Sequence, residues 1–307
     1  MPYHFTTLDV FTDRPFAGNP LAVFCDQPEL PTAAMQAIAR EFNLSETVFI
    51  VPSRDPRALR RLRIFTPVEE LPFAGHPTIG ASHVLVSSGL ADIRGTTGTF
   101  TLELEVGLVP INVARNEKGP PFLQLTTAVL PETRGPVPSR TELAHLLSLN
   151  EKDLLDDRDF AQAYSCGTPY LFIPVRDRAT LARARPDTAA WRKILHNAWA
   201  VNTYVICRDP ELPGSHIRAR MFAPELGVVE DAATGSAAAG LAGYLADREP
   251  AKDAQLHWIV EQGFEMGRPS ILHVEADKAG GRITAVRVGG MAVKMSEGTL
   301  LQVPSSS

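Results

Sequence analysis

The chain has 307 residues, enough for one large domain or two ordinary ones, and its 44% apolar and 21% charged residues are typical of a globular protein with a packed core. A formal net charge of −5 argues against a nucleic-acid partner, and the one basic run, residues 57–63, is better explained as a solvated strand edge or loop. No apolar run is long enough to cross a bilayer and the first residues lack the features of a signal peptide, so we expect a cytoplasmic protein without a membrane partner.

The cysteines and histidines show no spacing typical of a metal site or a disulfide framework. The three cysteines, Cys25, Cys166 and Cys207, are far apart, and no CxxC pair is present. The histidines form no HxH or HExxH motif, and no glycine-rich phosphate loop occurs. We therefore expect no metal and no cofactor, and a reducing compartment.

Strand and turn signals alternate along the first part of the chain. A helical pattern interrupts them once, where Thr32 lies near the expected N-cap. We predict strands at residues 3–11, 21–26, 47–52 and 62–67, a helix at 32–43 and a hairpin at 98–114.

The second part of the chain begins with a proline-rich stretch, residues 119–138, which suggests a crossover between two domains. We predict helices at residues 139–149 and 187–198, and strands at 200–209, 216–224, 269–277 and 283–295. Many antiparallel strands with a few helices indicate an α+β protein.

An internal repeat links the two parts. The string RIFTP at residues 63–67 returns as RMFAP at residues 220–224, about half a chain length further along. Each is followed by a loop, a corner of small residues and an apolar helix, at residues 77–90 and 236–246. Chance similarity of two short strings is the alternative, but the match continues into the helices, so we favour two duplicated domains.

Both repeated helices carry apolar or small residues on nearly every face. A helix that is apolar all round must be buried all round, and a curved sheet wrapped around each helix is the simplest way to achieve this. Gly80, Gly240 and Gly243 would then let the surrounding strands approach closely. Pro77 suits the first helical position, and Ser236 lies in or beside the first turn, where its hydroxyl could cap.

The N-termini of these two helices are candidate anion sites, because the first backbone N–H groups of a helix lack partners and carry partial positive charge. His76 stands at one end, and Gly235 and Ser236 stand at the other. Two such ends facing one cleft between the domains would form a receptor for a carboxylate.

Three side chains are candidates for acid–base chemistry: Glu46, His76 and Asp231. A carboxylate near apolar walls has a raised pKa and can exchange protons near neutral pH. Each also has a structural explanation: an exposed loop acid for Glu46, a satisfied structural histidine for His76 and a helix-cap acid for Asp231. Their positions near two paired helix corners favour a functional role.

Six segments of the chain, in order, resemble the PhzF-like isomerases of the phenazine-biosynthesis family. These are DVFTDRPFAGNPLAVF, NLSETVFI, RIFTPVEELPFAGHPTIGA, RARMFAPELGVVEDAATGSAA, EQGFEMGRPSILHV and VRVGGMAVKMSEGTL. The resemblance implies the diaminopimelate epimerase-like fold, with two similar domains, each a rolled, mostly antiparallel sheet around a central helix. We expect these domains at residues 1–122 and 123–293, with a C-terminal strand at about 294–307 returning to the first.

The resemblance also implies roles for individual residues. Glu46 matches the acid–base glutamate of the family, and His76 and Asp231 match its other polar site residues. Gly75, Gly235 and Ser236 match the donors that hold the substrate carboxylate. Diaminopimelate epimerases place a cysteine at each corner, whereas this chain has Ala74 and Ala232 there, which disfavours a two-thiol racemase.

The implied activity is a cofactor-independent isomerisation that moves a proton between carbons of a small carboxylate substrate. In the best-known family reaction that substrate is trans-2,3-dihydro-3-hydroxyanthranilate. The alternatives are an epimerase or racemase of an amino acid, or a binding protein for a small carboxylate without catalytic activity. We also expect a homodimer, since two-fold pairing is the commonest oligomeric state.

Overall fold

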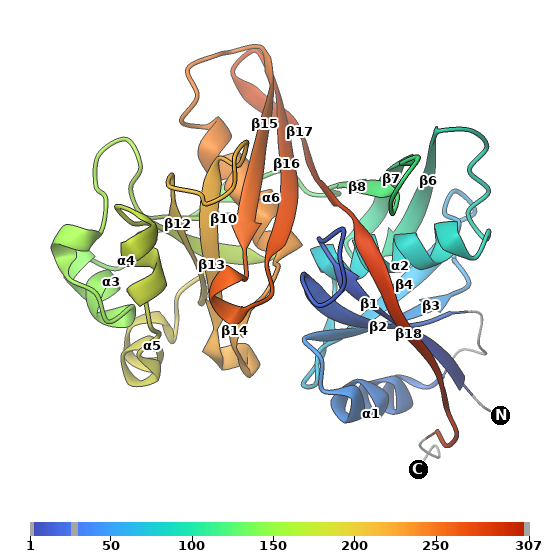
Figure 1. Ribbon diagram of the computed structural model, residues 1–307. Coiled ribbons are helices and arrows are strands. Elements are labelled where there is room, and N and C mark those ends of the chain that lie inside the picture. Colours follow the sequence, from blue (N-terminus) through green and yellow to red (C-terminus); the bar gives the residue numbers. More distant parts are fainter. Residues whose placement is uncertain (1–2, 26–29, 304–307) are drawn as a thin grey trace. The chain divides into compact units, whose positions relative to one another are not determined.

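The computed structural model describes residues 3–25 and 30–303, which form two compact units (Figure 1). The N-terminal unit comprises Met1–Ala128 and Gly289–Ser307, and the C-terminal unit comprises Val129–Val288. The chain therefore leaves the first unit, completes the second and returns to the first. No helix among the described residues is both long and apolar enough to span a membrane.

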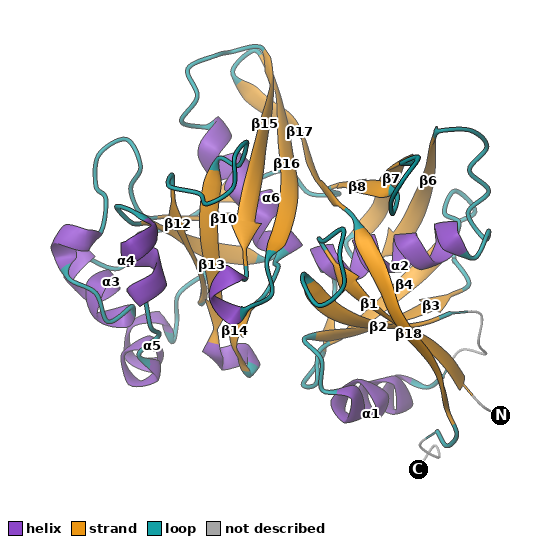
Figure 2. Cartoon of the chain, in the orientation of Figure 1, coloured by secondary structure: helices purple, strands orange, loops and turns teal. Residues whose placement is uncertain are grey.

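The N-terminal unit is a rolled sheet with one helix inside it and one outside (Figure 2). Its elements are β1 (Tyr3–Val10), β2 (Asn19–Phe24), α1 (Thr32–Phe42), β3 (Glu46–Val51), β4 (Arg60–Phe65), β5 (Glu70–Leu71), α2 (Gly75–Ser87), β6 (Thr97–Leu104), β7 (Gly107–Ala114), β8 (Phe122–Thr126) and β18 (Ala292–Leu300). The returning strand β18 pairs antiparallel with β1 along its whole length.

The C-terminal unit repeats this plan and adds a layer of short helices. Its elements are β9 (Glu132–Thr133), α3 (Arg140–Leu146), η1 (Glu151–Asp153), β10 (Gln162–Ser165), β11 (Pro169–Pro174), α4 (Arg178–Arg183), α5 (Thr188–Leu195), β12 (Asn202–Cys207), β13 (Ile217–Ala223), η2 (Pro224–Leu226), β14 (Val228–Asp231), α6 (Gly235–Ala246), β15 (Ala254–Gln262), η3 (Phe264–Met266), β16 (Ser270–Ala279) and β17 (Arg282–Gly290).

The strand pairings show that the two units are built alike. In the N-terminal unit β1–β2 is antiparallel, β2–β3 parallel, β3–β4 and β4–β5 antiparallel, and β4–β6 parallel. In the C-terminal unit β10–β11 is antiparallel, β11–β12 parallel, β12–β13 and β13–β14 antiparallel, and β13–β15 parallel. The predicted α+β fold of two similar rolled-sheet domains is confirmed.

The two repeated helices are the inner cores of their units. Every residue of α6 is buried, and α2 is buried from its first residue to Val86. The expected close approach at glycines is confirmed: a Cβ on Gly80 would overlap Leu21, one on Gly240 would lie 3.0 Å from the Phe172 ring, and one on Gly243 would lie 2.5 Å from Pro131. Each missing side chain is replaced by a group of the surrounding sheet.

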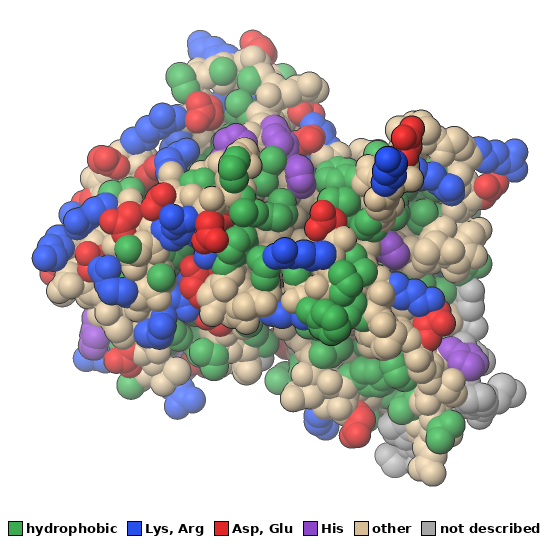
Figure 3. All heavy atoms as spheres, in the orientation of Figure 1, with side chains coloured by type: hydrophobic (Ala, Val, Ile, Leu, Met, Phe, Trp, Pro, Cys, Tyr) green, Lys and Arg blue, Asp and Glu red, His purple; other side chains and the backbone are tan. Residues whose placement is uncertain are grey.

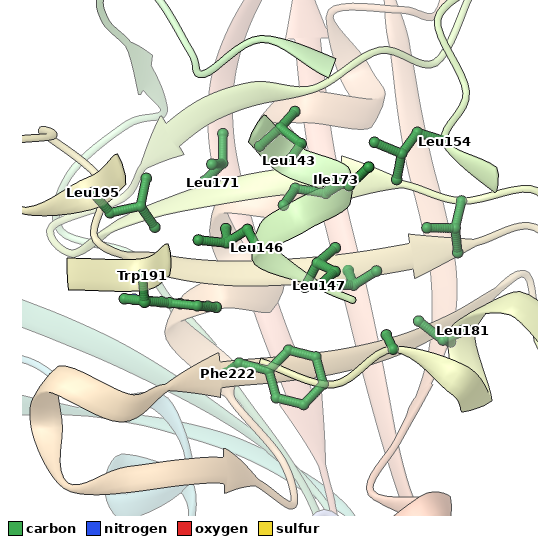
Figure 4. Packing of buried hydrophobic residues seen from close by; sticks show 14 of the residues in the cluster. Leu143, Leu146, Leu147, Leu154, Leu171, Ile173, Leu181, Trp191, Leu195 and Phe222 are labelled. Carbon is green, nitrogen blue, oxygen red and sulfur yellow. The ribbon is translucent and has the colours of Figure 1, made fainter. Parts of the chain in front are cut away.

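The outer faces of the sheets are covered differently. In the N-terminal unit α1 packs Met35 and Ile38 onto an aromatic cluster that includes Phe24 and Phe49. In the C-terminal unit α3, α4 and α5 cover the sheet, and their leucines and Trp191 form a second core with it (Figure 4). These outer layers are the main difference between the repeats.

Several local predictions are wrong in detail. Both inner helices begin earlier than expected, so Pro77 is the third rather than the first residue of α2, and α6 has Thr234 at its N-cap. Thr32 does lie next to the N-cap, as expected: Pro31 is the N-cap of α1, Thr32 is its first residue, and the Thr32 hydroxyl accepts a hydrogen bond from Arg63. Strands β10, β11 and β15 and helix α4 were not predicted, and the strand expected at 283–295 is two strands, β17 and β18.

The basic run is also only partly a solvated edge. Arg57 is exposed and pairs with Asp55, whereas Arg63 is buried in β4. The strand expected at 21–26 ends at Phe24, and its last residue, Asp26, lies outside the described residues.

Candidate active site

Three polar side chains meet at the N-terminus of α2. Glu46 is the first residue of β3, Asn19 is the first residue of β2, and His76 is the second residue of α2. The Asn19 amide nitrogen lies 3.2 Å from His76 Nδ1, and His76 Nε2 lies 3.3 Å from Glu46 Oε2. The structure therefore brings Glu46 and His76 together, with Asn19 behind the imidazole.

The imidazole of His76 is held neutral. It is almost completely buried, and this burial lowers its pKa from 6.5 to about 3. An amide N–H of Asn19 donated to Nδ1 makes that nitrogen an acceptor, so the ring proton resides on Nε2. His76 consequently carries no positive charge, and its Nε2 lies 3.3 Å from Glu46 Oε2 without the geometry of a hydrogen bond.

Glu46 is not an exposed loop acid. Its side chain is only 15% exposed, and it begins a strand whose remaining residues are all buried and mostly apolar. The parallel pairing of β2 and β3 places Leu21 directly beside it. A carboxylate in these surroundings is only partly solvated and has the His76 imidazole as a polar neighbour.

The corner before α6 holds Asp231 in a polar network. Asp231 ends β14, and its carboxylate accepts a hydrogen bond from Thr234 Oγ1 at 2.7 Å. The Gln262 amide connects the network, because it donates to Asp231 O and to Thr234 Oγ1 and accepts from Thr234 N. The corner is thus fixed from both sides, as a binding surface requires.

Gly235 and Ser236 are the first two residues of α6. The Ser236 hydroxyl lies 2.8 Å from the Tyr170 hydroxyl and does not cap the helix. Because the first N–H groups of a helix have no intrahelical acceptor, this end can bind an anion. Gly75 has the same position at the start of α2.

An arginine–glutamate pair stands next to each corner. In the N-terminal unit Arg63 donates two hydrogen bonds to Glu70, and in the C-terminal unit Arg220 donates two to Glu230. Both arginines are buried, and both acids lie on the short strand that leads to the inner helix. The pairs fix β5 against β4 and β14 against β13, and so fix where α2 and α6 begin.

A family comparison identifies the chain. The sequence profile described as phenazine biosynthesis-like protein matches residues 8–298. The chain belongs to the PhzF family.

Curated relatives of this PhzF-family chain are named isomerases. An uncharacterized isomerase of Mesorhizobium japonicum is 40% identical over 297 residues, which cover 95% of this chain and 96% of the relative. A trans-2,3-dihydro-3-hydroxyanthranilate isomerase of Pseudomonas aeruginosa is 35% identical over 305 residues, covering 96% of this chain and 98% of the relative. The chain is therefore an isomerase of the PhzF type.

Solved structures show the same fold. The PhzF-family phenazine biosynthesis protein of Bacillus anthracis has a TM-score of 0.89 and 28% identity, covering 98% of this chain and all of the other, 100%. A probable proline racemase of Agrobacterium radiobacter, at 15% identity, has a TM-score of 0.65, with 97% of this chain and 92% of the racemase covered. The racemase likeness concerns the fold alone.

Sequence reasoning missed the neutral partners of the candidate site residues: Asn19, Tyr170, Thr234 and Gln262. The sequence contains one signal for two of these residues. Asn19 lies in the string GNP of the N-terminal unit, and the similar string GTP directly precedes Tyr170 in the C-terminal unit. Within residues 3–25 and 30–303, no group of three or more His, Cys, Asp or Glu side chains is arranged to hold a metal ion.

Proposed function

We propose that the protein is a cofactor-independent isomerase that moves a proton between two carbons of a small carboxylate substrate, trans-2,3-dihydro-3-hydroxyanthranilate or a related compound. The observation that carries the proposal is the contact between Glu46 and His76 at the start of α2. It is supported by the relative of that name in Pseudomonas aeruginosa, which aligns over nearly the whole chain.

In this mechanism Glu46 acts first as a base and then as an acid. It takes a proton from one carbon, the electron pair of that C–H bond moves into the conjugated system, and the proton returns to another carbon. Substrate and product are thus isomers, and no oxidant or reductant is needed. A positioned general base contributes roughly 10²- to 10⁴-fold, so orientation and electrostatics must supply the remainder.

His76 would orient Glu46 through its Nε2–H and could assist proton delivery, because a neutral imidazole can donate without placing a full charge beside the carboxylate. Charge on His76 would hold Glu46 as a carboxylate and weaken it as a base. The burial that keeps His76 neutral therefore supports proton exchange at Glu46.

Gly75, Gly235 and Ser236 would bind the substrate carboxylate through backbone N–H groups and the Ser236 hydroxyl. Asp231 would hold another polar group of the substrate. The support for this assignment is the position of these residues at the first turns of two buried helices, of which α6 has 12 residues and α2 has 13.

Replacement of Glu46 tests the proposal. Glu46→Gln keeps the volume of the side chain but removes its basicity, so turnover of trans-2,3-dihydro-3-hydroxyanthranilate should fall at least about a hundredfold while binding changes little. In deuterated water the wild-type product should carry deuterium at the carbon that gains the proton. The matched control is Glu105→Gln, which removes an exposed carboxylate of the same unit and should leave the rate unchanged.

Near wild-type turnover by Glu46→Gln would contradict the proposal and direct the search for the base to His76 or Asp231. The wild-type protein could bind the compound without converting it. In that case a related carboxylate must be turned over in a Glu46-dependent way for the proposed reaction to stand. If none is, the binding-protein alternative replaces the enzyme.

The racemase alternative has no support at the corners. Ala74 and Ala232 occupy the positions of the two thiols, and Cys166 is buried, which raises the pKa of its thiol to about 12. We further propose a homodimer. Sedimentation at micromolar concentration should give twice the monomer mass of 33.4 kDa, and a monomer alone would refute this part.

A further inference from the structure

A cavity of about 610 Å³ lies in the C-terminal unit, on the side of the sheet away from α6. Its floor contains Ala163 and Leu171, which are directly paired on β10 and β11. The neighbouring pair on the same strands, Tyr164 and Tyr170, points to the opposite face, where Tyr170 contacts Ser236. Since side chains alternate along a strand, the cavity and the candidate active site use opposite faces of β11.

The cavity has two walls of different kinds. One is the proline-rich segment 134–138, whose prolines restrict its backbone. The other is residues 192–200, the end of α5 and the loop that follows it. Small residues, among them Ala198 and Ala200, leave the space open above Leu171, which packs against the helical layer beside Leu195 (Figure 4). The volume lies within the roughly 300–1,000 Å³ typical of small-molecule sites.

The rim of the cavity is positively charged although the protein as a whole is negative. The residues that line it include Arg134, Arg192, Lys193 and His196. Glu142 is the single acidic residue among them. Glu142 is already engaged, because its Oε2 accepts from the backbone N–H and hydroxyl of Ser139 at the N-cap of α3. On the face of the molecule drawn in Figure 3, acidic and basic side chains are intermixed.

The arginines of the rim can release their present partners. Arg134 donates to Glu132, but both side chains are largely exposed, at 60% and 46%. Arg192 is 3.8 Å from Glu225, and its side chain is 80% exposed. Exposed pairs of this kind contribute little to stability, so a ligand carboxylate can replace the present partner.

An aromatic side chain is part of the same cavity. The half-buried Trp199 lines it, and the Arg134 guanidinium lies over the Trp199 ring, 5.2 Å from the centroid. A planar guanidinium next to an indole offers stacking to a flat ring and two parallel N–H donors to a carboxylate. Trp191, by contrast, is fully buried and donates its indole N–H to Val201 O.

We propose that this cavity binds a small planar aromatic carboxylate. The apolar floor and Trp199 accept the ring, and Arg134 and Arg192 accept the carboxylate. Because the floor is formed by β11, the bound ligand contacts the strand that carries Tyr170 to Ser236. The proposal does not depend on the reaction catalysed by the protein.

The test follows the three indole N–H signals of the full-length protein by NMR, with 2-naphthoate as the probe. The signal removed by Trp199→Phe should shift saturably, while that of Trp258 should not move. The neutral 2-naphthamide should bind at least about tenfold more weakly, because it lacks the charge that the rim recognises.

Variants locate the site. Arg134→Gln combined with Arg192→Gln should weaken 2-naphthoate binding at least about tenfold. Arg94→Gln, the matched control in the N-terminal unit, removes an arginine that is 89% exposed and should leave affinity unchanged. The side chains of Arg134, Arg192 and Arg94 are all largely exposed, so these variants should fold, which circular dichroism verifies before titration.

Four outcomes would overturn the proposal. The first is a Trp199 signal that does not respond to the probe, and the second is equal affinity for acid and amide. The third is 2-naphthoate binding that the combined arginine variant leaves unchanged, which would place the probe outside this cavity. A Trp199 signal that changes with protein concentration in the absence of probe would also overturn it, by assigning the cavity to contact between copies of the chain.

Discussion

Acidification should destabilise the protein through His76. Burial lowers the pKa of His76 from its ordinary 6.5 to about 3, so the folded state keeps this imidazole neutral where an unfolded chain would protonate it. Between these two values the unfolded state binds more protons. The stability that the neutral ring allows is therefore fully present above pH 6.5 and is lost progressively as the pH falls toward 3.

The magnitude follows from the shift itself. Each unit of pKa difference corresponds to about 1.4 kcal/mol, so the loss between about pH 7.5 and about pH 5 is about 2 kcal/mol. The full loss, below the folded pKa, approaches about 5 kcal/mol. This is an appreciable share of the roughly 5–15 kcal/mol by which a domain is normally stable.

Urea unfolding at the two pH values, compared between wild type and His76→Asn, measures this contribution. The variant cannot titrate at this position, so its stability should fall about 2 kcal/mol less than that of the wild type over the same interval. His83 is also buried, and burial and the charge of Lys294 lower the pKa of its ring. Because His83 is present in both proteins, its contribution cancels.

The imidazole carbon signals provide a second measurement. The chemical shift of the His76 imidazole carbons should not change between pH 8 and pH 5 in the folded protein. A midpoint near the ordinary value of 6.5, or an equal loss of stability in wild type and His76→Asn, would refute the neutral buried imidazole and with it the orientation inferred for Glu46.

Three further changes test packing and chemistry. Arg220→Met removes the arginine partner of the Glu230 carboxylate and three hydrogen bonds to backbone carbonyls, and should lower the free energy of unfolding by about 3–5 kcal/mol in urea denaturation. Gly243→Ala places a methyl group against Pro131, and this overpacking should lower the free energy of unfolding by about 1–3 kcal/mol. The higher helix propensity of alanine offsets about 1 kcal/mol of this loss. Cys166→Ser should leave turnover within a few-fold, and iodoacetamide should label Cys166 slowly, because burial raises the pKa of its thiol.

Each of these has a control on the surface. Arg57→Met breaks an exposed pair and should leave the free energy of unfolding nearly unchanged, so an equally small effect of Arg220→Met would show that the buried pair has no special weight. Gly119→Ala meets no atom within 4 Å and should be neutral, and a neutral Gly243→Ala would show that Pro131 moves aside. Rapid inactivation that follows labelling of Cys166 would contradict a bystander thiol.

The repeat and the buried helices were predictable because they depend on local pattern. An all-round apolar helix is visible in the letters of residues 236–246, and the strings RIFTP and RMFAP mark equivalent strands. The structure adds why the arginine of each string recurs: Arg63 and Arg220 each bind a glutamate that leads to the inner helix. In each pair the arginine and the glutamate are close in sequence. Even so, the glutamate that binds each arginine can be identified only when the register of the strands is known.

The polar partners of the site could not be predicted, because they come from distant parts of the chain. Asn19 reaches His76 only because β2 and β3 run parallel with Leu21 beside Glu46. Gln262 reaches Asp231 because β15 lies parallel to β13 in the C-terminal unit. Such pairings are set by tertiary register, which composition and periodicity do not specify.

The path of the chain has a consequence for synthesis. Strand β18 completes the sheet of the first unit, although it is translated after the whole of the second unit. Domains usually fold in the order in which they leave the ribosome. In this protein the second unit can be completed first. Residues 129–288 can close their own sheet while β1 still lacks a partner on one edge. The unit that is synthesised first is therefore completed last. A released chain that ends before residue 292 should therefore contain a protease-resistant C-terminal unit and a protease-sensitive N-terminal one.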